Sequence, residues 1–152
     1  MEYFKRKCIN IVVIVLGLIM ALVPFVIAPV CPAMANGMYM SCHYSGLLAM
    51  YCGIAVAIIA FVGMFLNNKM FGILINILNL AIALAVILIP NKILKIQIGV
   101  MKNGMPKFMG YCMKDTMHCI ANHTFVITTT ISAIIAILSL GSLIYILMKK
   151  EK

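Results

Sequence analysis

Charged side chains, and acidic ones above all, are scarce in this sequence. Only 10% of the 152 residues are charged, with 12 Lys and Arg against three Asp and Glu, and no charge lies between Cys8 and Asn68. A soluble domain has about 25% charged residues, so this chain lacks the polar surface that water requires. Asp115 is the only acidic residue outside the two tails. The sequence therefore argues against paired-carboxylate catalysis, carboxylate-bridged metal sites and ordinary hydrolytic chemistry.

Other signatures of chemistry are missing as well. The chain has no Gly-rich phosphate loop, no Gly-x-Ser-x-Gly and no His-Glu-x-x-His. Its basic tails lack the interleaved aromatic residues that nucleic-acid binding uses, so no nucleic-acid partner is expected. The long apolar runs contain no Asp, Glu, Lys, Arg or His, which argues against a proton-coupled pump or a voltage sensor.

Apolar residues, in contrast, make up 65% of the chain. Four runs reach the length of about 20 residues that crosses a bilayer, at roughly 9–30, 46–66, 70–90 and 124–148. The turn at 67–69 is so short that the second and third spans must be antiparallel. The sequence predicts one all-α domain over residues 1–152, an integral membrane four-helix bundle of two helical hairpins with outer loops at about 31–45 and 91–123.

Lysine and arginine counts predict the orientation in the membrane. One side has seven of them and the other has five, all in the last loop; the seven are Lys5, Arg6, Lys7, Lys69, Lys149, Lys150 and Lys152. Both termini are therefore predicted to be cytoplasmic, in a multi-pass plasma membrane protein. The apolar run after Lys7 is too long for the core of a signal peptide, so we expect it to remain as the first span.

Small and polar residues within the spans predict how the helices pack. Ala49, Gly53 and Ala57 recur at every fourth position of the second span, a spacing that lets helix backbones approach closely. Similar positions are Gly17 and Ala21 in the first span and Thr129, Ala133 and Ala136 in the fourth. We expect them to serve packing within the bundle rather than dimerisation.

Two asparagines, Asn76 and Asn79, lie three residues apart in the third span. They share one face of the helix and are expected to point inward, where they would form hydrogen bonds to a neighbouring helix.

The outer loops contain four of the six cysteines: Cys31 and Cys42 in the first, Cys112 and Cys119 in the second. Each loop has Met-x-Cys shortly before a span, which suggests an internal repeat. An extracytoplasmic compartment usually oxidises thiols, so structural disulfides are the first expectation. Cys31 with Cys42 and Cys112 with Cys119 would order each loop, whereas cross-pairing would join the hairpins, and the sequence does not choose between these schemes.

Two other interpretations of the loops stay open. Four spans with a cysteine pair in each outer loop are also the layout of membrane thiol-disulfide oxidoreductases. The pairs here are 42 − 31 = 11 and 119 − 112 = 7 residues apart rather than Cys-x-x-Cys, and no intramembrane Arg is available to a quinone, which weighs against this interpretation.

The second alternative is Cu(I) handling, because thioether, thiolate and imidazole groups are the donors that Cu(I) prefers. Besides the cysteines, the loop residues concerned are Met34, Met40, His43, Met113, Met117, His118 and His123. Methionine more often fills apolar contacts, and the chain has 14 of them, so no metal site, cofactor or catalytic residue is predicted.

The loop motifs resemble a known family. Cys31-Pro32-x-Met34, then Met40-x-Cys42-His43-x-Ser45-Gly46, and Gly110-x-Cys112-Met113 with Met117-x-Cys119 are similar to the small bacterial membrane proteins of domain of unknown function 4418. The resemblance implies an accessory role beside a partner such as an ABC-type transporter. The leading expectation is therefore a non-enzymatic membrane partner protein with disulfide-ordered outer loops.

Overall fold

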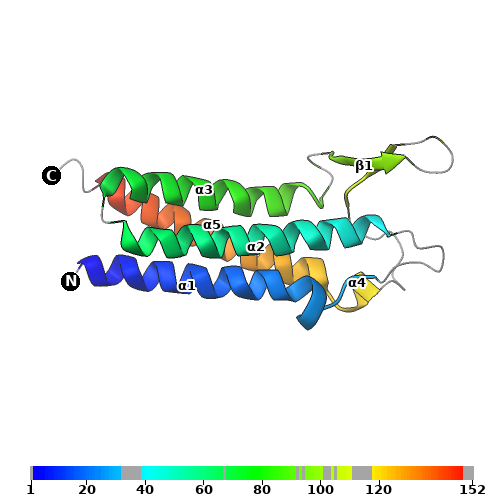
Figure 1. The fold of residues 1–152 in the computed structure, drawn as a ribbon, viewed down its shortest axis with the longest axis horizontal. Helices are drawn as coiled ribbons and strands as arrows, with labels where there is room; N and C mark the ends of the chain where they lie inside the picture. The colour runs from blue at the N-terminus through cyan, green and yellow to red at the C-terminus, as the bar shows by residue number, and fades with distance from the viewer. Residues whose placement is uncertain are drawn as a thin grey trace.

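Four long helices run side by side and form an elongated bundle (Figure 1). The computed structural model describes residues 2–31, 39–66, 68–91, 93, 95–100, 104, 106–110 and 118–148, without the side chains of residues 2–6 and 118. The long helices are α1 (Glu2–Leu22), α2 (Ser41–Phe65), α3 (Lys69–Leu88) and α5 (Thr124–Met148). The predicted all-α four-helix bundle is confirmed.

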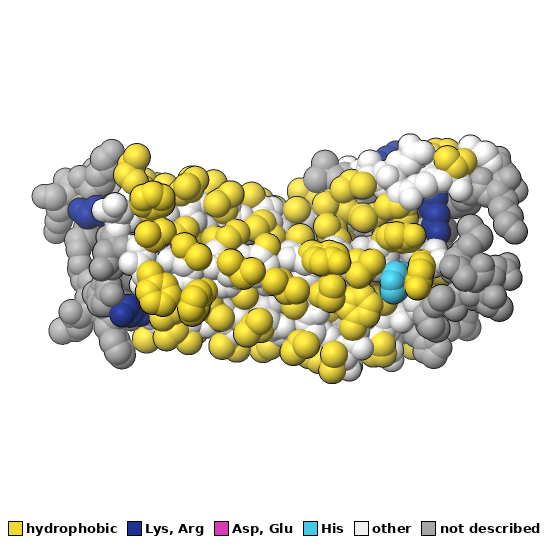
Figure 2. Space-filling view, in the orientation of Figure 1, with side chains coloured by type: hydrophobic (Ala, Val, Ile, Leu, Met, Phe, Trp, Pro, Cys, Tyr) yellow, Lys and Arg dark blue, Asp and Glu magenta, His cyan; other side chains and the backbone are white. Residues whose placement is uncertain are grey.

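The surface of the bundle is apolar along most of its length. Figure 2 shows hydrophobic side chains over the whole middle of one face, with Lys and Arg only near its two ends. Large side chains such as Ile58, Phe61 and Ile137 are 57%, 53% and 69% exposed. All four helices are long and apolar enough to cross a membrane. These features are those of a multi-pass protein whose solvent is lipid.

The helices pack as two hairpins. Helix α1 packs mainly on α2, and α3 packs mainly on α5. The start of α1, the end of α5 and the turn between α2 and α3 lie together, which we call the terminal end of the bundle (Figure 1). The opposite end, which we call the loop end, carries the two longer connections. The internal repeat and the sidedness of the membrane stay predictions.

Close packing of α1 on α2 depends on small residues, as the sequence predicts. A Cβ atom at Gly17 would lie 2.9 Å from the backbone oxygen of Gly53. A Cβ atom at Gly53 would lie 2.6 Å from the backbone oxygen of Gly17 and 2.7 Å from the backbone nitrogen of Ala21. The two backbones are therefore in direct contact, and the predicted packing role of these residues within the bundle is confirmed.

Helix α5 buries a different face from the predicted one. Its buried polar side chains are Thr124, Thr128, Ser132, Ser139 and Ser142, whereas Thr129, Ala133 and Ala136 are only half-buried. Thr128 and Ser132 donate hydrogen bonds to the carbonyl groups four residues earlier, at 2.8 and 2.9 Å. Because these hydroxyl groups are satisfied within the helix, they pack like small apolar residues.

Within the part of the chain that the structure describes, the two asparagines of α3 form none of the predicted interhelical hydrogen bonds. The side-chain nitrogen of Asn76 donates to the carbonyl of Gly72 in its own helix, at 2.8 Å. Asn79 is buried as predicted, but its Oδ1 has no hydrogen-bond partner among the described residues. The prediction failed because an asparagine can reach the carbonyl four residues earlier without a neighbouring helix.

The loop end differs from the prediction in its details. Helix α1 continues as a π-helical turn, η1 (Val23–Ile27), which contains Pro24, so the first helical segment ends before Val30. Helix α2 starts at Ser41, five residues before the predicted start at Gly46. The second loop contains an antiparallel pair of strands, β1 (Gln97–Val100) and β2 (Pro106–Phe108), in which Gly99 pairs with Lys107, and a short helix, α4 (His118–Ala121).

Candidate functional site

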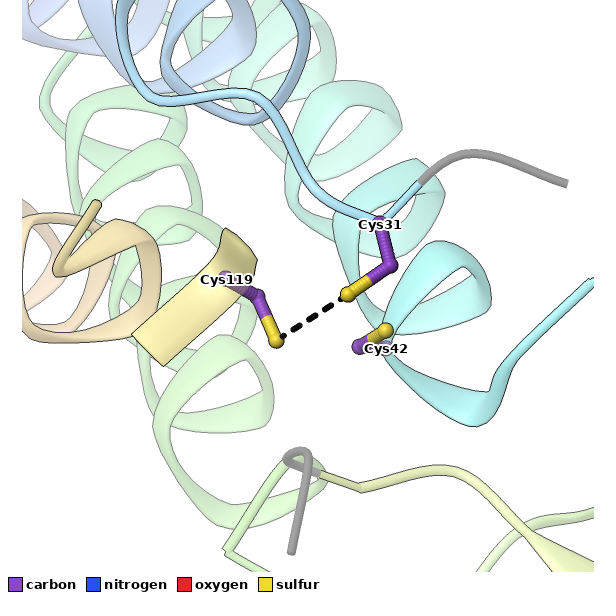
Figure 3. Close-up of side chains that lie close together, drawn as sticks. All are labelled: Cys31, Cys42 and Cys119. Carbon is purple, nitrogen blue, oxygen red and sulfur yellow. Dashed lines mark hydrogen bonds between the residues drawn. The ribbon is translucent and has the colours of Figure 1, made fainter. Parts of the chain in front are cut away.

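Three cysteines from different segments meet inside the loop end. Cys31 follows η1, Cys42 lies in the first turn of α2 and Cys119 lies on α4, and their side chains point toward one another (Figure 3). The three Sγ atoms lie within 4.8 Å of one another, and those of Cys31 and Cys119 are 3.6 Å apart. The side chains are only 4%, 1% and 1% exposed. We call this group the sulfur cluster.

Hydrogen bonds between distant segments hold the sulfur cluster in place. Thr124 Oγ1 donates to the carbonyl of Ala28 at 2.8 Å, and Asn122 Nδ2 donates to the carbonyl of Pro29 at 3.3 Å. Ser45 Oγ also donates to the carbonyl of Gly110 at 3.3 Å. These contacts bind the second loop to the first hairpin. They explain how Cys119 reaches a residue 88 positions earlier.

No disulfide joins the three cysteines of the sulfur cluster to one another. Cys31 and Cys42 are thiols. Cys119 is bonded to neither of them, and a disulfide at Cys119 stays a prediction. The predicted bond between Cys31 and Cys42 is therefore not formed. Cys112 lies outside the described residues, so its predicted pairing stays a prediction. The Cys31 Sγ donates a hydrogen bond to the Cys119 sulfur.

The sulfur cluster also has the donor atoms that a soft metal ion uses. Three cysteine sulfurs within 4.8 Å could hold Cu(I) if all three were thiolates, and Met40 packs against the same cluster. A sulfur in a disulfide is not a thiolate ligand, so a disulfide at Cys119 and a three-thiolate metal site exclude each other.

The other predicted loop residues are dispersed. His43 stacks on Tyr39, with ring centroids 4.3 Å apart, and lies edge-on to Phe25, with ring centroids 5.8 Å apart. Among the described residues, His43 is not part of the group whose possible metal-ligand atoms lie close together. His123 is exposed in the turn between α4 and α5. Met34, Met113 and Met117, and the side chain of His118, lie outside the described part of the chain.

The spacing of the cysteines along the chain did not predict the sulfur cluster. Cys31 and Cys42 are 11 residues apart, so they lack the Cys-x-x-Cys pattern, yet the structure brings their sulfurs together. The early start of α2 is responsible, because it places Cys42 on a helix beside the segment that leaves η1. The one available signal was the position of each cysteine next to the end of a span.

The hydrogen bond from Thr124 to Ala28 provides a test of this arrangement. Thr124→Val keeps the shape of the buried side chain but leaves the carbonyl of Ala28 without its donor, so we expect the free energy of unfolding to fall by about 1–3 kcal/mol. Thr130→Val is the matched control, because Thr130 is exposed and donates within its own helix. Thermal unfolding in detergent measures both, and equal effects would contradict the proposed role of Thr124.

Comparison with known proteins identifies the family. The profile of the domain of unknown function DUF4418 matches residues 13–145, which include the whole sulfur cluster. The chain belongs to the DUF4418 family. This result confirms the resemblance found in the loop motifs. No curated protein and no solved structure matches the chain.

Proposed function

We propose that this DUF4418 protein is a membrane thiol-disulfide exchange protein. In this proposal the first-loop cysteines, Cys31 and Cys42, pass two electrons to the predicted disulfide of Cys119. The observation that carries the proposal is the 3.6 Å contact between the Cys31 thiol and the Cys119 sulfur. A thiolate breaks a disulfide by direct attack on one of its sulfurs, so this contact is the encounter that the reaction needs.

The reaction balances without another reactant. The Cys31 thiolate attacks Sγ of Cys119, forms a Cys31–Cys119 disulfide and releases the other sulfur of the original disulfide as a thiolate, which takes up a proton. The Cys42 thiolate then attacks Sγ of Cys31. A Cys31–Cys42 disulfide forms, and Cys119 leaves as a thiolate. All three sulfurs lie within 4.8 Å, so small side-chain movements are enough for both steps.

A purely structural role explains the cluster less well. A structural disulfide within the first loop would join Cys31 to Cys42, and one between the hairpins would join either of them to Cys119, whereas both Cys31 and Cys42 are thiols. Two buried thiols contribute no covalent link between the hairpins.

The proposal includes an orientation and an electron donor. The loop end would face the extracytoplasmic side of the plasma membrane, as the lysine and arginine counts predict. A dithiol of another protein would reduce a Cys31–Cys42 disulfide and restore the two thiols. An accessory role beside an ABC-type transporter is compatible with this exchange, and it stays an expectation from the family resemblance.

Cys42→Ser tests the proposal directly. Without Cys42 the second attack cannot occur, so the Cys31–Cys119 disulfide should accumulate when an alkylating reagent blocks the released thiol. Mass spectrometry of the digested protein should then find the peptide of Cys31 bonded to the peptide of Cys119.

Cys52→Ser is the matched control, because Cys52 lies on the same helix but outside the sulfur cluster. It should accumulate no such link. A Cys42→Ser protein that folds like the control and never forms the Cys31–Cys119 link would refute exchange. Tight retention of Cu(I) by all three reduced cysteines, without any link, would favour the metal interpretation instead.

A further inference from the structure

The second loop carries large aliphatic side chains that are exposed outside the membrane spans. Ile93, Ile96 and Val100 are 66%, 40% and 60% exposed. They follow the end of α3, and Val100 is the last residue of β1, which lies beyond the end of α3 at the loop end (Figure 1). Lipid covers such side chains on a membrane span, but three of them close together outside a span indicate a surface that binds an apolar partner. We call Ile93, Lys95, Ile96 and Val100 the outer patch.

Strand β2 holds the outer patch at a fixed place on the bundle. Lys107 Nζ donates a hydrogen bond to the carbonyl of Tyr39 and lies 5.8 Å from the centre of the Tyr44 ring. Ser45 Oγ donates to the carbonyl of Gly110, just after β2, at 3.3 Å. These contacts bind β2 to the start of α2. Its partner strand β1 is therefore the more exposed of the two.

The length of α3 places the outer patch at the depth of the lipid head groups. Helix α3 has 20 residues, Lys69–Leu88. At 1.5 Å per residue this is about 30 Å, the thickness of the hydrocarbon core of a bilayer. The outer patch begins shortly after Leu88, in the head-group layer that adjoins the core. Tyr39, 44% exposed at the same end of the bundle, fits this depth, because tyrosine is enriched at membrane interfaces.

The second loop is also strongly basic. It has five lysines against one acidic residue, Asp115. Lys95 is exposed between Ile93 and Ile96, and the described side chains on the face drawn in Figure 2 include lysine at this end and no acidic residue. Lysines are usually concentrated on the cytoplasmic side of a membrane, whereas this loop is predicted to lie outside, and the exchange proposal does not use them. A negatively charged partner at the loop end would account for these lysines.

We infer that the outer patch binds the head groups of anionic phospholipids. Ile93, Ile96 and Val100 insert among the head groups and the upper acyl chains, and the ammonium group of Lys95 pairs with the lipid phosphates. Lipid is the occupant because the outer patch adjoins the end of a membrane span and combines apolar with cationic side chains, as segments that lie in the membrane interface do. The patch is separate from the sulfur cluster, so this inference does not depend on the proposed exchange.

A tryptophan reporter tests the inference. The chain contains no tryptophan, so Val100→Trp introduces the only indole. The full-length variant is placed in phosphatidylcholine nanodiscs that contain a lipid with a nitroxide on its head group, and the proportion of phosphatidylglycerol is raised stepwise. We expect the nitroxide to quench the indole fluorescence, the quenching to rise with phosphatidylglycerol, and high salt to remove this rise. Ile93→Trp is the second reporter, should Val100→Trp fail to fold.

Lys95→Gln in the reporter protein tests the contribution of charge. Loss of one lysine at the membrane surface should raise the proportion of phosphatidylglycerol needed for half-maximal quenching about two- to fivefold. Lys69→Gln is the matched control, because Lys69 is an exposed lysine at the terminal end of the bundle. It should leave the quenching of the reporter unchanged.

Two results would overturn the inference. Quenching by acrylamide in the water but not by the head-group nitroxide would show that the outer patch stands in solution, where an acidic protein is its partner. Equal quenching with and without phosphatidylglycerol would show contact with lipid but no recognition of its charge. Neither result bears on the Cys31–Cys119 link, which tests the exchange proposal separately.

Discussion

Gly53→Leu is expected to separate α1 from α2 and to lower the free energy of unfolding by about 3 kcal/mol or more. A Cβ atom at this position would lie 2.6 Å from the backbone oxygen of Gly17 and 2.7 Å from the backbone nitrogen of Ala21. Both neighbours are backbone atoms, so no side-chain rotation can relieve the overlap. The helices must move apart, and the remaining atoms of leucine would hold them further apart along the seam.

Gly141→Leu is the control for this prediction. Gly141 also lies in a long membrane helix, but a Cβ atom there would meet nothing within 4 Å. Leucine favours the helix over glycine by about 0.5–1 kcal/mol, so this variant should be slightly more stable than the wild type. Thermal unfolding in detergent and the yield of monodisperse protein measure both variants. Equal stability of the two would contradict the direct backbone contact between α1 and α2.

Cys31→Ser is expected to abolish electron transfer between the two loops. The Cys31 sulfur lies within reach of both Cys42 and Cys119, and both steps of the proposed exchange pass through it. Serine preserves the size of the side chain but offers no thiolate. In protein prepared with Cys31 and Cys42 reduced and Cys119 oxidised, Cys119 should therefore stay oxidised in the variant and equilibrate with the first loop in the wild type.

The measurement is an acid quench followed by alkylation and mass spectrometry, which counts Cys119 thiols over time. Cys31→Ser should show neither a Cys119 thiol nor a link between the loops, whereas Cys42→Ser should show the link. Cys8→Ser and Cys52→Ser should behave like the wild type, because neither residue belongs to the sulfur cluster. Reduction of Cys119 at the wild-type rate in Cys31→Ser would refute the central role of Cys31.

The scarcity of charge and the four apolar runs were enough to predict the class of the protein and its four spans. The last span, 124–148, agrees with α5 residue for residue. The positions of Gly17 and Gly53 also predicted a close helix contact. These features are readable because they follow from local quantities: the transfer free energy of each residue into lipid, and the regular spacing of side chains on a helix.

Tertiary structure alone decided the site. Spacing along the chain does not predict which cysteine lies beside Cys31. Cys42 is 11 residues away and Cys119 is 88 residues away, yet both lie in the same cluster. The cluster forms because the π-helical turn ends α1 early, α2 starts early and Thr124 binds the second loop to Ala28. The buried face of α5 depends in the same way on where the first hairpin lies. Distances between remote segments arise from the packing of the whole bundle, and no local pattern in the sequence encodes them.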